Sequence, residues 1–93
     1  MPPSPRRTPA AVAVIADDHP LVATALREIL EGGLGLRIAA MAGNGVEAIA
    51  AAGRWRPALL TLALALPLSS GLEPLQAVLA ASPATRVVVV TGM

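Results

Sequence analysis

The chain has 93 residues, which is enough for one domain and too few for two. Hydrophobic residues make up 55% of it and charged residues 14%, a composition that argues against disorder along the whole chain. There is no cysteine, which excludes a disulfide framework and a thiolate metal site. The net charge is only +1 and the arginines are scattered along the sequence, so we expect no nucleic-acid interface.

Residues 1–11 are rich in proline and offer little to bury, so we expect a disordered leader ahead of one domain over residues 12–93. The apolar run Ala10–Ala16 ends in two aspartates, which an export signal would not tolerate. The run Ala58–Leu66 is far shorter than the ~18 residues that span a bilayer. We therefore expect a soluble, cytoplasmic protein without membrane contacts.

From residue 12 onwards the pattern alternates between strands and helices. Apolar runs predict four strands, at Val12–Ala16, Leu36–Met41, Ala58–Leu66 and Val87–Val90. Between them, apolar residues at helical spacing predict three helices: one from Pro20 to Gly32-Gly33, one capped by Asn44 with Glu47, and one ending at Ser82-Pro83. This order predicts an α/β fold in which helices cover both faces of a parallel sheet.

Each helix has an expected buried face. These faces are Leu21, Val22, Ala25, Leu26, Ile29 and Leu30 in the first helix, Val46, Ile49 and Ala50 in the second, and Leu72, Leu75, Val78 and Leu79 in the third. Ser69-Ser70-Gly71 is expected to form the turn before the third helix.

Ligands of parallel α/β sheets bind beyond the carboxyl ends of the strands, so functional residues are sought there. Asp17 and Asp18 follow the first strand and Thr91 follows the fourth. Adjacent carboxylates can hold Mg²⁺, but they can equally stabilise the positive end of the helix that begins at Pro20. His19 has no second histidine with which to share a metal, so we expect it to make a local loop contact.

Several segments together resemble a known family. They are Val12–Leu21, Ala42–Ala48, Arg56-Pro57, Leu66-Pro67 with Gly71-Leu72-Glu73, and Thr85–Thr91. In order and spacing they are similar to the receiver domains of bacterial two-component response regulators that precede LuxR-type outputs. The resemblance covers nearly all of Val12–Met93 and implies a flavodoxin-like fold.

The resemblance implies roles for individual residues. Asp17 and Asp18 fall on the acidic pair that holds Mg²⁺, and Thr91 falls on the switch hydroxyl that binds the phosphoryl group. Ala63 falls where the family has its phosphate-accepting aspartate, and Thr61, two residues earlier, is expected to point deeper into the core. The family's lysine is also missing, since the chain has none, and so are its fourth helix, fifth strand and fifth helix.

We therefore expect a degenerate receiver without catalytic residues, with at most weak Mg²⁺ binding. It would act through protein contacts with a histidine kinase, another regulator or a second copy, and not with nucleic acid. The implied strand order 2-1-3-4 leaves Val87–Val90 as an apolar edge that favours self-association or partner binding. The alternatives are a remnant of a longer regulator and, less favoured, a small Mg²⁺-dependent α/β enzyme using Asp17 and Asp18.

Overall fold

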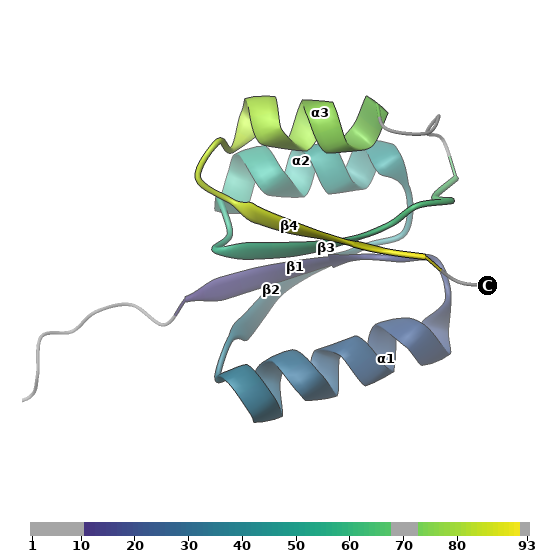
Figure 1. Ribbon diagram of the computed structural model, residues 1–93, viewed down its shortest axis with the longest axis vertical. Helices are drawn as coiled ribbons and strands as arrows, with labels where there is room; N and C mark the ends of the chain where they lie inside the picture. Colours follow the sequence, from purple (N-terminus) through teal and green to yellow (C-terminus); the bar gives the residue numbers. More distant parts are fainter. Residues whose placement is uncertain (1–10, 68–72, 92–93) are drawn as a thin grey trace, which may run out of the picture.

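The computed structural model describes residues 11–67 and 73–91. The chain runs through β1 (Val12–Ala16), α1 (Pro20–Glu28), a π-helical turn η1 (Ile29–Gly33), β2 (Arg37–Ala42), α2 (Gly45–Trp55), β3 (Leu59–Ala63), α3 (Glu73–Ala81) and β4 (Arg86–Val90). All strand pairs are parallel and the sheet order is β2-β1-β3-β4, as expected. Figure 1 shows α2 and α3 on one face of the sheet and α1 on the other.

β1 is the best-covered strand because it has a strand on each side and helices above and below. Residues 13–16 are completely buried, and their side chains alternate between the two faces. Val14 and Ala16 join the larger core beneath α2 and α3, whereas Ala13 and Ile15 join the smaller core beneath α1. A short continuous apolar run is the pattern expected of a strand buried on both faces.

The second helix packs through alanines and not through the larger residues that the periodicity predicted. Val46 is 61% exposed and Ala50 is also exposed, while Ala48, Ala51 and Ala52 are buried against the sheet and α3. Small side chains let a helix approach its neighbours closely, so the alanine face fits the space between β1, β2 and α3. The predicted face was therefore wrong, apart from the half-buried Ile49.

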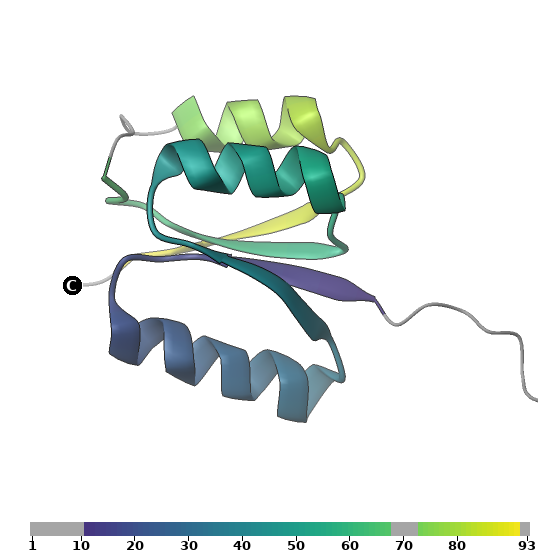
Figure 2. The same cartoon turned by 180° about the vertical axis from the view of Figure 1, so that it is seen from behind.

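The predicted start of α2 is confirmed. The Oδ1 atom of Asn44 accepts a hydrogen bond from the Glu47 amide at 2.8 Å. The Glu47 carboxylate reaches back to accept from the Gly43 amide at 2.9 Å, one residue earlier than a capping box requires. Figure 2 shows α2 above the sheet and in front of α3, continuing from the end of β2.

The first helix buries fewer residues than its apolar stripe predicted. Only Ala23 and Leu30 are buried, with Leu26 half-buried, whereas Leu21 is 86% exposed and Ile29 58%. Among the described elements, α1 is alone on its face of the sheet, so the far side of the stripe has nothing to pack against (Figure 1). The full stripe was therefore a wrong prediction of what is buried.

The remaining boundaries differ modestly from expectation. β2 lies one residue later than predicted, and β3 stops at Ala63 because its neighbours β1 and β4 end at the same level. In the third helix Val78 is buried and Leu75 half-buried, while Leu79 is 40% exposed. The leader up to residue 10, Ser69-Ser70-Gly71 and Leu72 lie outside the described residues.

The beginning of β4 is joined to the beginning of β3 by buried hydroxyl groups. The Thr85 hydroxyl donates to the carbonyl oxygen of Pro57 at 2.6 Å and lies 2.6 Å from the Ser82 hydroxyl. On its other side β4 has no partner among the described strands, and Val88 and Val89 are 49% and 39% exposed. The predicted exposed apolar edge is therefore present.

Candidate functional site at the carboxyl edge of the sheet

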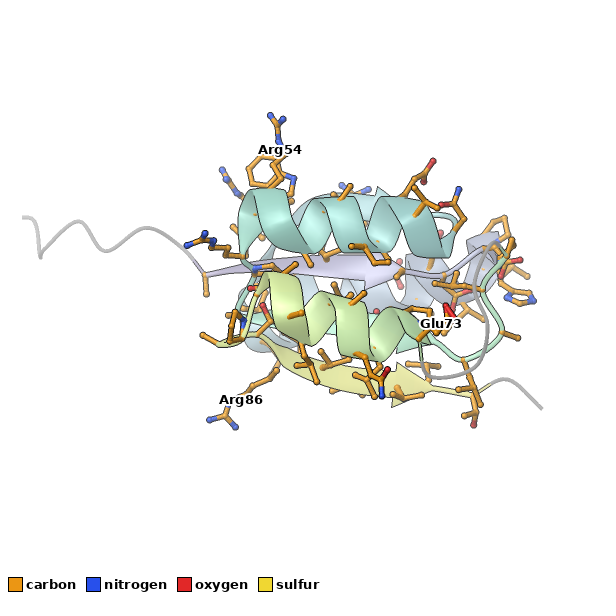
Figure 3. The ribbon with its side chains drawn as sticks, turned by 90° about the horizontal axis from the view of Figure 1, so that it is seen from above. Arg54, Glu73 and Arg86 are labelled. Atoms are coloured by element: carbon orange, nitrogen blue, oxygen red, sulfur yellow. The ribbon has the colours of Figure 1, made fainter. Side chains whose placement is uncertain are left out.

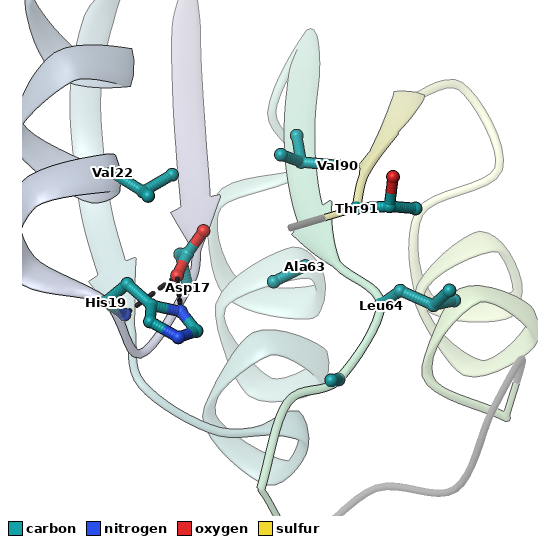
Figure 4. Close-up of a pocket in the computed structure, with 8 residues that line it drawn as sticks. Asp17, His19, Val22, Ala63, Leu64, Val90 and Thr91 are labelled. Carbon is teal, nitrogen blue, oxygen red and sulfur yellow. Dashed lines mark hydrogen bonds and ion pairs between the residues drawn. The ribbon is translucent and has the colours of Figure 1, made fainter. Parts of the chain in front are cut away.

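A cleft of about 460 Å³ opens at the carboxyl edge, between the start of α1 and the ends of β3 and β4. Figure 4 shows its walls, which are mostly aliphatic with a carboxylate on one side and a hydroxyl on the other. The residues that line it are Asp17, His19, Val22, Ala63, Leu64, Ala65, Val90 and Thr91.

Asp17 is the buried acid of the site. It follows β1 directly, its amide donates to the Ala42 carbonyl at 2.9 Å, and its side chain is only 3% exposed. Its Oδ1 atom accepts from the His19 amide at 2.8 Å and lies 3.0 Å from the His19 Nδ1 atom. These contacts fix the carboxylate at the mouth of the cleft.

Asp18 and His19 complete a small cluster of ligand atoms. An Asp18 oxygen lies 3.1 Å from the same Nδ1 atom, and one ligand atom of each of Asp17, Asp18 and His19 lies within 4.8 Å of the others. His19 is 67% exposed and makes the local loop contact that was expected. Asp18 is half-exposed at 35% and is not among the residues that line the cleft.

On the opposite side of the cleft, Ala63 is paired in register with Val90, and Thr91 follows immediately. The structure therefore brings Asp17, Ala63 and Thr91 together, although they are far apart in the sequence (Figure 4). Thr61 is 3% exposed, deeper in the fold as expected, and its hydroxyl has no hydrogen-bond partner among the described residues.

The sequence did not point to Val22, Leu64 or Ala65 as part of this site. They line the cleft because the start of α1 and the segment that follows β3 lie on either side of it. No local sequence pattern predicts that arrangement. Two carboxylates could hold a hard cation whose remaining positions are filled by water. The alkyl side chain of Ala63 can supply neither a ligand nor a nucleophile.

Residues 13–93 match the response regulator receiver domain. The chain belongs to this family. The receiver fold is also that of a Burkholderia pseudomallei response regulator solved with a phosphorylated aspartic acid, a calcium ion and citrate. That structure is 29% identical, has a TM-score of 0.77, and is matched over 89% of this chain and 48% of its own.

Two curated proteins resemble this receiver domain in sequence. A protein-glutamate methylesterase/protein-glutamine glutaminase of Hahella chejuensis is 40% identical over 85% of this chain and 22% of its own length. An uncharacterized transcriptional regulatory protein of Bacillus subtilis is 30% identical over 83% of this chain and 35% of its own. The chain thus spans about a fifth to a third of the length of these relatives.

Proposed function

We propose that this receiver domain takes part in two-component signal transduction through protein–protein contacts, without accepting a phosphoryl group at residue 63. The observation that carries the proposal is the position of Ala63, which lines the cleft between Asp17 and Thr91. β3 contains no acid that could replace it, and the buried hydroxyl of Thr61 has no hydrogen-bond partner among the described residues, and so no base to activate it. The partner would be a histidine kinase or another regulator.

Within the same proposal, Asp17 and Asp18 keep a weak site for Mg²⁺. Two protein carboxylates on one side leave most of an octahedral shell to water, and a third carboxylate at position 63 would face the same cleft. Thr91 retains the place of the switch hydroxyl at the end of β4. Mg²⁺ binding would then be a remnant of the site and not a step in signalling.

The connected output would be of the LuxR type. The support is the resemblance of Val12–Leu21 and Thr85–Thr91 to that subfamily and the transcriptional regulatory relative of Bacillus subtilis. A remnant with no activity of its own remains the second reading, and it differs from the first only in having no partner.

The decisive experiment restores the missing group. The wild-type chain and Ala63→Asp are incubated with Mg²⁺ and acetyl phosphate, and the intact mass is measured. We expect no added phosphoryl group on the wild-type chain and slow, Mg²⁺-dependent uptake by the variant, because the new carboxylate would face Asp17 across the cleft. Ala65→Asp is the matched control, since residue 65 also lines the cleft but lies beyond the end of β3. Uptake by the wild-type chain would contradict the proposal.

A further inference from the structure

Charged side chains separate along the direction of the strands. Of the acids in the described residues, Asp17, Asp18, Glu47 and Glu73 all lie at the carboxyl edge, where β1 ends and where α2 and α3 begin. Figure 3 shows Glu73 at one end of the molecule and Arg54 and Arg86 at the other. Among the described residues, arginines that are scattered in the sequence therefore share one end of the fold, although Arg54 and Arg86 project from opposite sides of it.

Four exposed arginines form what we call the arginine edge: Arg37, Arg54, Arg56 and Arg86. Arg37 and Arg86 are the first residues of the two outermost strands, β2 and β4. Arg56 closes α2 just before β3, and Arg54 lies in the last turn of α2. Because three inter-strand spacings of ~4.8 Å separate the strands of Arg37 and Arg86, the edge is roughly 14 Å wide.

Only some of the arginines have a structural role that explains their position. Arg54, in the last turn of α2, complements the negative end of the helix dipole, and Arg27 does so in α1, where it also pairs with Glu31 at 3.2 Å. Arg37, Arg56 and Arg86 lie outside the helices and make no ion pair among the described residues. With no ionic partner in the part of the chain that the structure describes, these three guanidinium groups are available to a ligand.

Trp55 adds an apolar surface beside these charges. It is the only aromatic residue of the chain, is 37% exposed, and has the Arg54 guanidinium 5.2 Å from its ring centroid. An exposed indole beside a guanidinium group, at an end of the fold with further exposed arginines, has the composition of a protein-binding surface, where tryptophan and arginine are enriched.

We infer that the arginine edge is a docking surface for an acidic segment of a partner protein, rich in aspartate and glutamate. Every basic residue of the chain is an arginine, whose planar fork binds carboxylates in pairs, and arginine clusters are a recurring means of recognising acidic motifs. Glu28 and Glu31 lie towards the same end of the molecule, which suits a short segment better than a continuous phosphate backbone. The inference rests on the proposed function, since it states the chemistry of the protein contact.

The single tryptophan permits a direct test. Poly-L-glutamate is titrated into the full chain at about 20 mM salt, and Trp55 emission is followed. We expect a saturable change that weakens strongly at about 150 mM salt, where exposed charges are screened over ~8 Å. Arg37→Gln/Arg86→Gln, which leaves Trp55 and its neighbours untouched, should weaken binding about tenfold, the sum of two exposed charge pairs.

A matched control separates a local site from overall charge. Thr24→Glu/Gln76→Glu lowers the net charge by the same two units at exposed helix positions away from the arginine edge, and it should bind as the wild-type chain does. Equal weakening by both double variants would overturn the inference, as would tighter binding of a single-stranded oligonucleotide than of poly-glutamate. An emission change that follows the concentration of the chain alone would also overturn it, because the ligand would then be the acidic edge of a second copy.

Far-ultraviolet circular dichroism of each variant is the check that it is folded. The result is independent of phosphoryl uptake at position 63: a wild-type chain that accepts phosphate would refute the proposed function and leave poly-glutamate binding unchanged. Loss of poly-glutamate binding alone would refute only the partner chemistry.

Discussion

Thr85 and Thr61 of this receiver domain are both buried, but only the hydroxyl of Thr85 has hydrogen-bond partners among the described residues. The hydroxyl of Thr85 donates to the Pro57 carbonyl and contacts the Ser82 hydroxyl, so the start of β4 is fastened to the start of β3. The hydroxyl of Thr61 is buried with no partner among the described residues. A buried polar group costs free energy unless it is hydrogen-bonded, so the same atom stabilises the fold at one position and destabilises it at the other.

Thr61→Val and Thr85→Val therefore make the same chemical change with opposite expected signs. Thr85→Val should lower the free energy of unfolding by about 1–3 kcal/mol, because it leaves a buried carbonyl and a buried hydroxyl without their partner. Thr61→Val should be neutral or raise stability by up to about 1 kcal/mol. Urea unfolding followed by Trp55 emission measures both, and each variant is the control for the other. Destabilisation by Thr61→Val would mean that its hydroxyl is satisfied, for example by an internal water.

The sequence predicted the position of a site residue mainly where that residue directly follows a strand. Asp17 and Thr91 were placed correctly at the carboxyl edge because each directly follows an apolar strand, and Ala63 because the resemblance to receiver domains points to that position of the third strand. The gathering of the arginines could not be foreseen. Arg37, Arg56 and Arg86 are separated by long intervals in the sequence, and only the parallel arrangement brings the starts of their strands to one edge.

At the scale of elements, the prediction succeeded for the strands and only in part for the helix faces, where Leu30 and Val78 are buried as expected. A strand such as β1 has both faces buried, so its apolar run marks it whatever packs on it. Which face of a helix is buried in this fold depends on the elements that lie beside it. In α2 a face of alanines wins because β1, β2 and α3 are close, leaving Val46 exposed, and in α1 the outer part of the stripe, including Leu21, has no neighbour among the described elements.

The open side of β4 is the element from which we expect association. Val88 and Val89 expose apolar side chains beside unpaired backbone groups, a template for pairing with another strand. Val88→Lys should shift the chain towards monomer and change its stability little, since Val88 is already 49% exposed. Val46→Lys, at an exposed position of α2, is the matched control and should leave association unchanged.

Size-exclusion chromatography with light scattering measures this effect. The association expected of β4 persists at high salt because backbone hydrogen bonds and apolar contacts are not screened, unlike contacts of the arginine edge. A wild-type chain that is monomeric at all concentrations tested would count against strand pairing by β4.

At the scale of the whole molecule, the two edges of the sheet carry opposite charge and should respond to different ligands. Mg²⁺ should shift amide NMR signals near Asp17, Asp18 and Thr91 only, and Asp18→Asn should remove this response while leaving the dispersed spectrum of a folded domain. Asp18→Asn suits the test because the Asp18 side chain is half-exposed and because His19 also contacts Asp17, a contact that the variant keeps. An unfolded variant would mean that Asp18 serves the start of α1 and not a metal.

None of the helices in the described residues is long and apolar enough to cross a membrane.

The strand order also has a consequence for how the sheet is assembled during synthesis. β1 is made first, β2 is added on one side of it, and β3 and then β4 are added on the other. Once β2 and β3 are in place, growth continues at a single edge, and that edge is always the strand most recently translated. A chain folded only as far as β3 would therefore expose an apolar strand edge to other chains until β4 pairs with it.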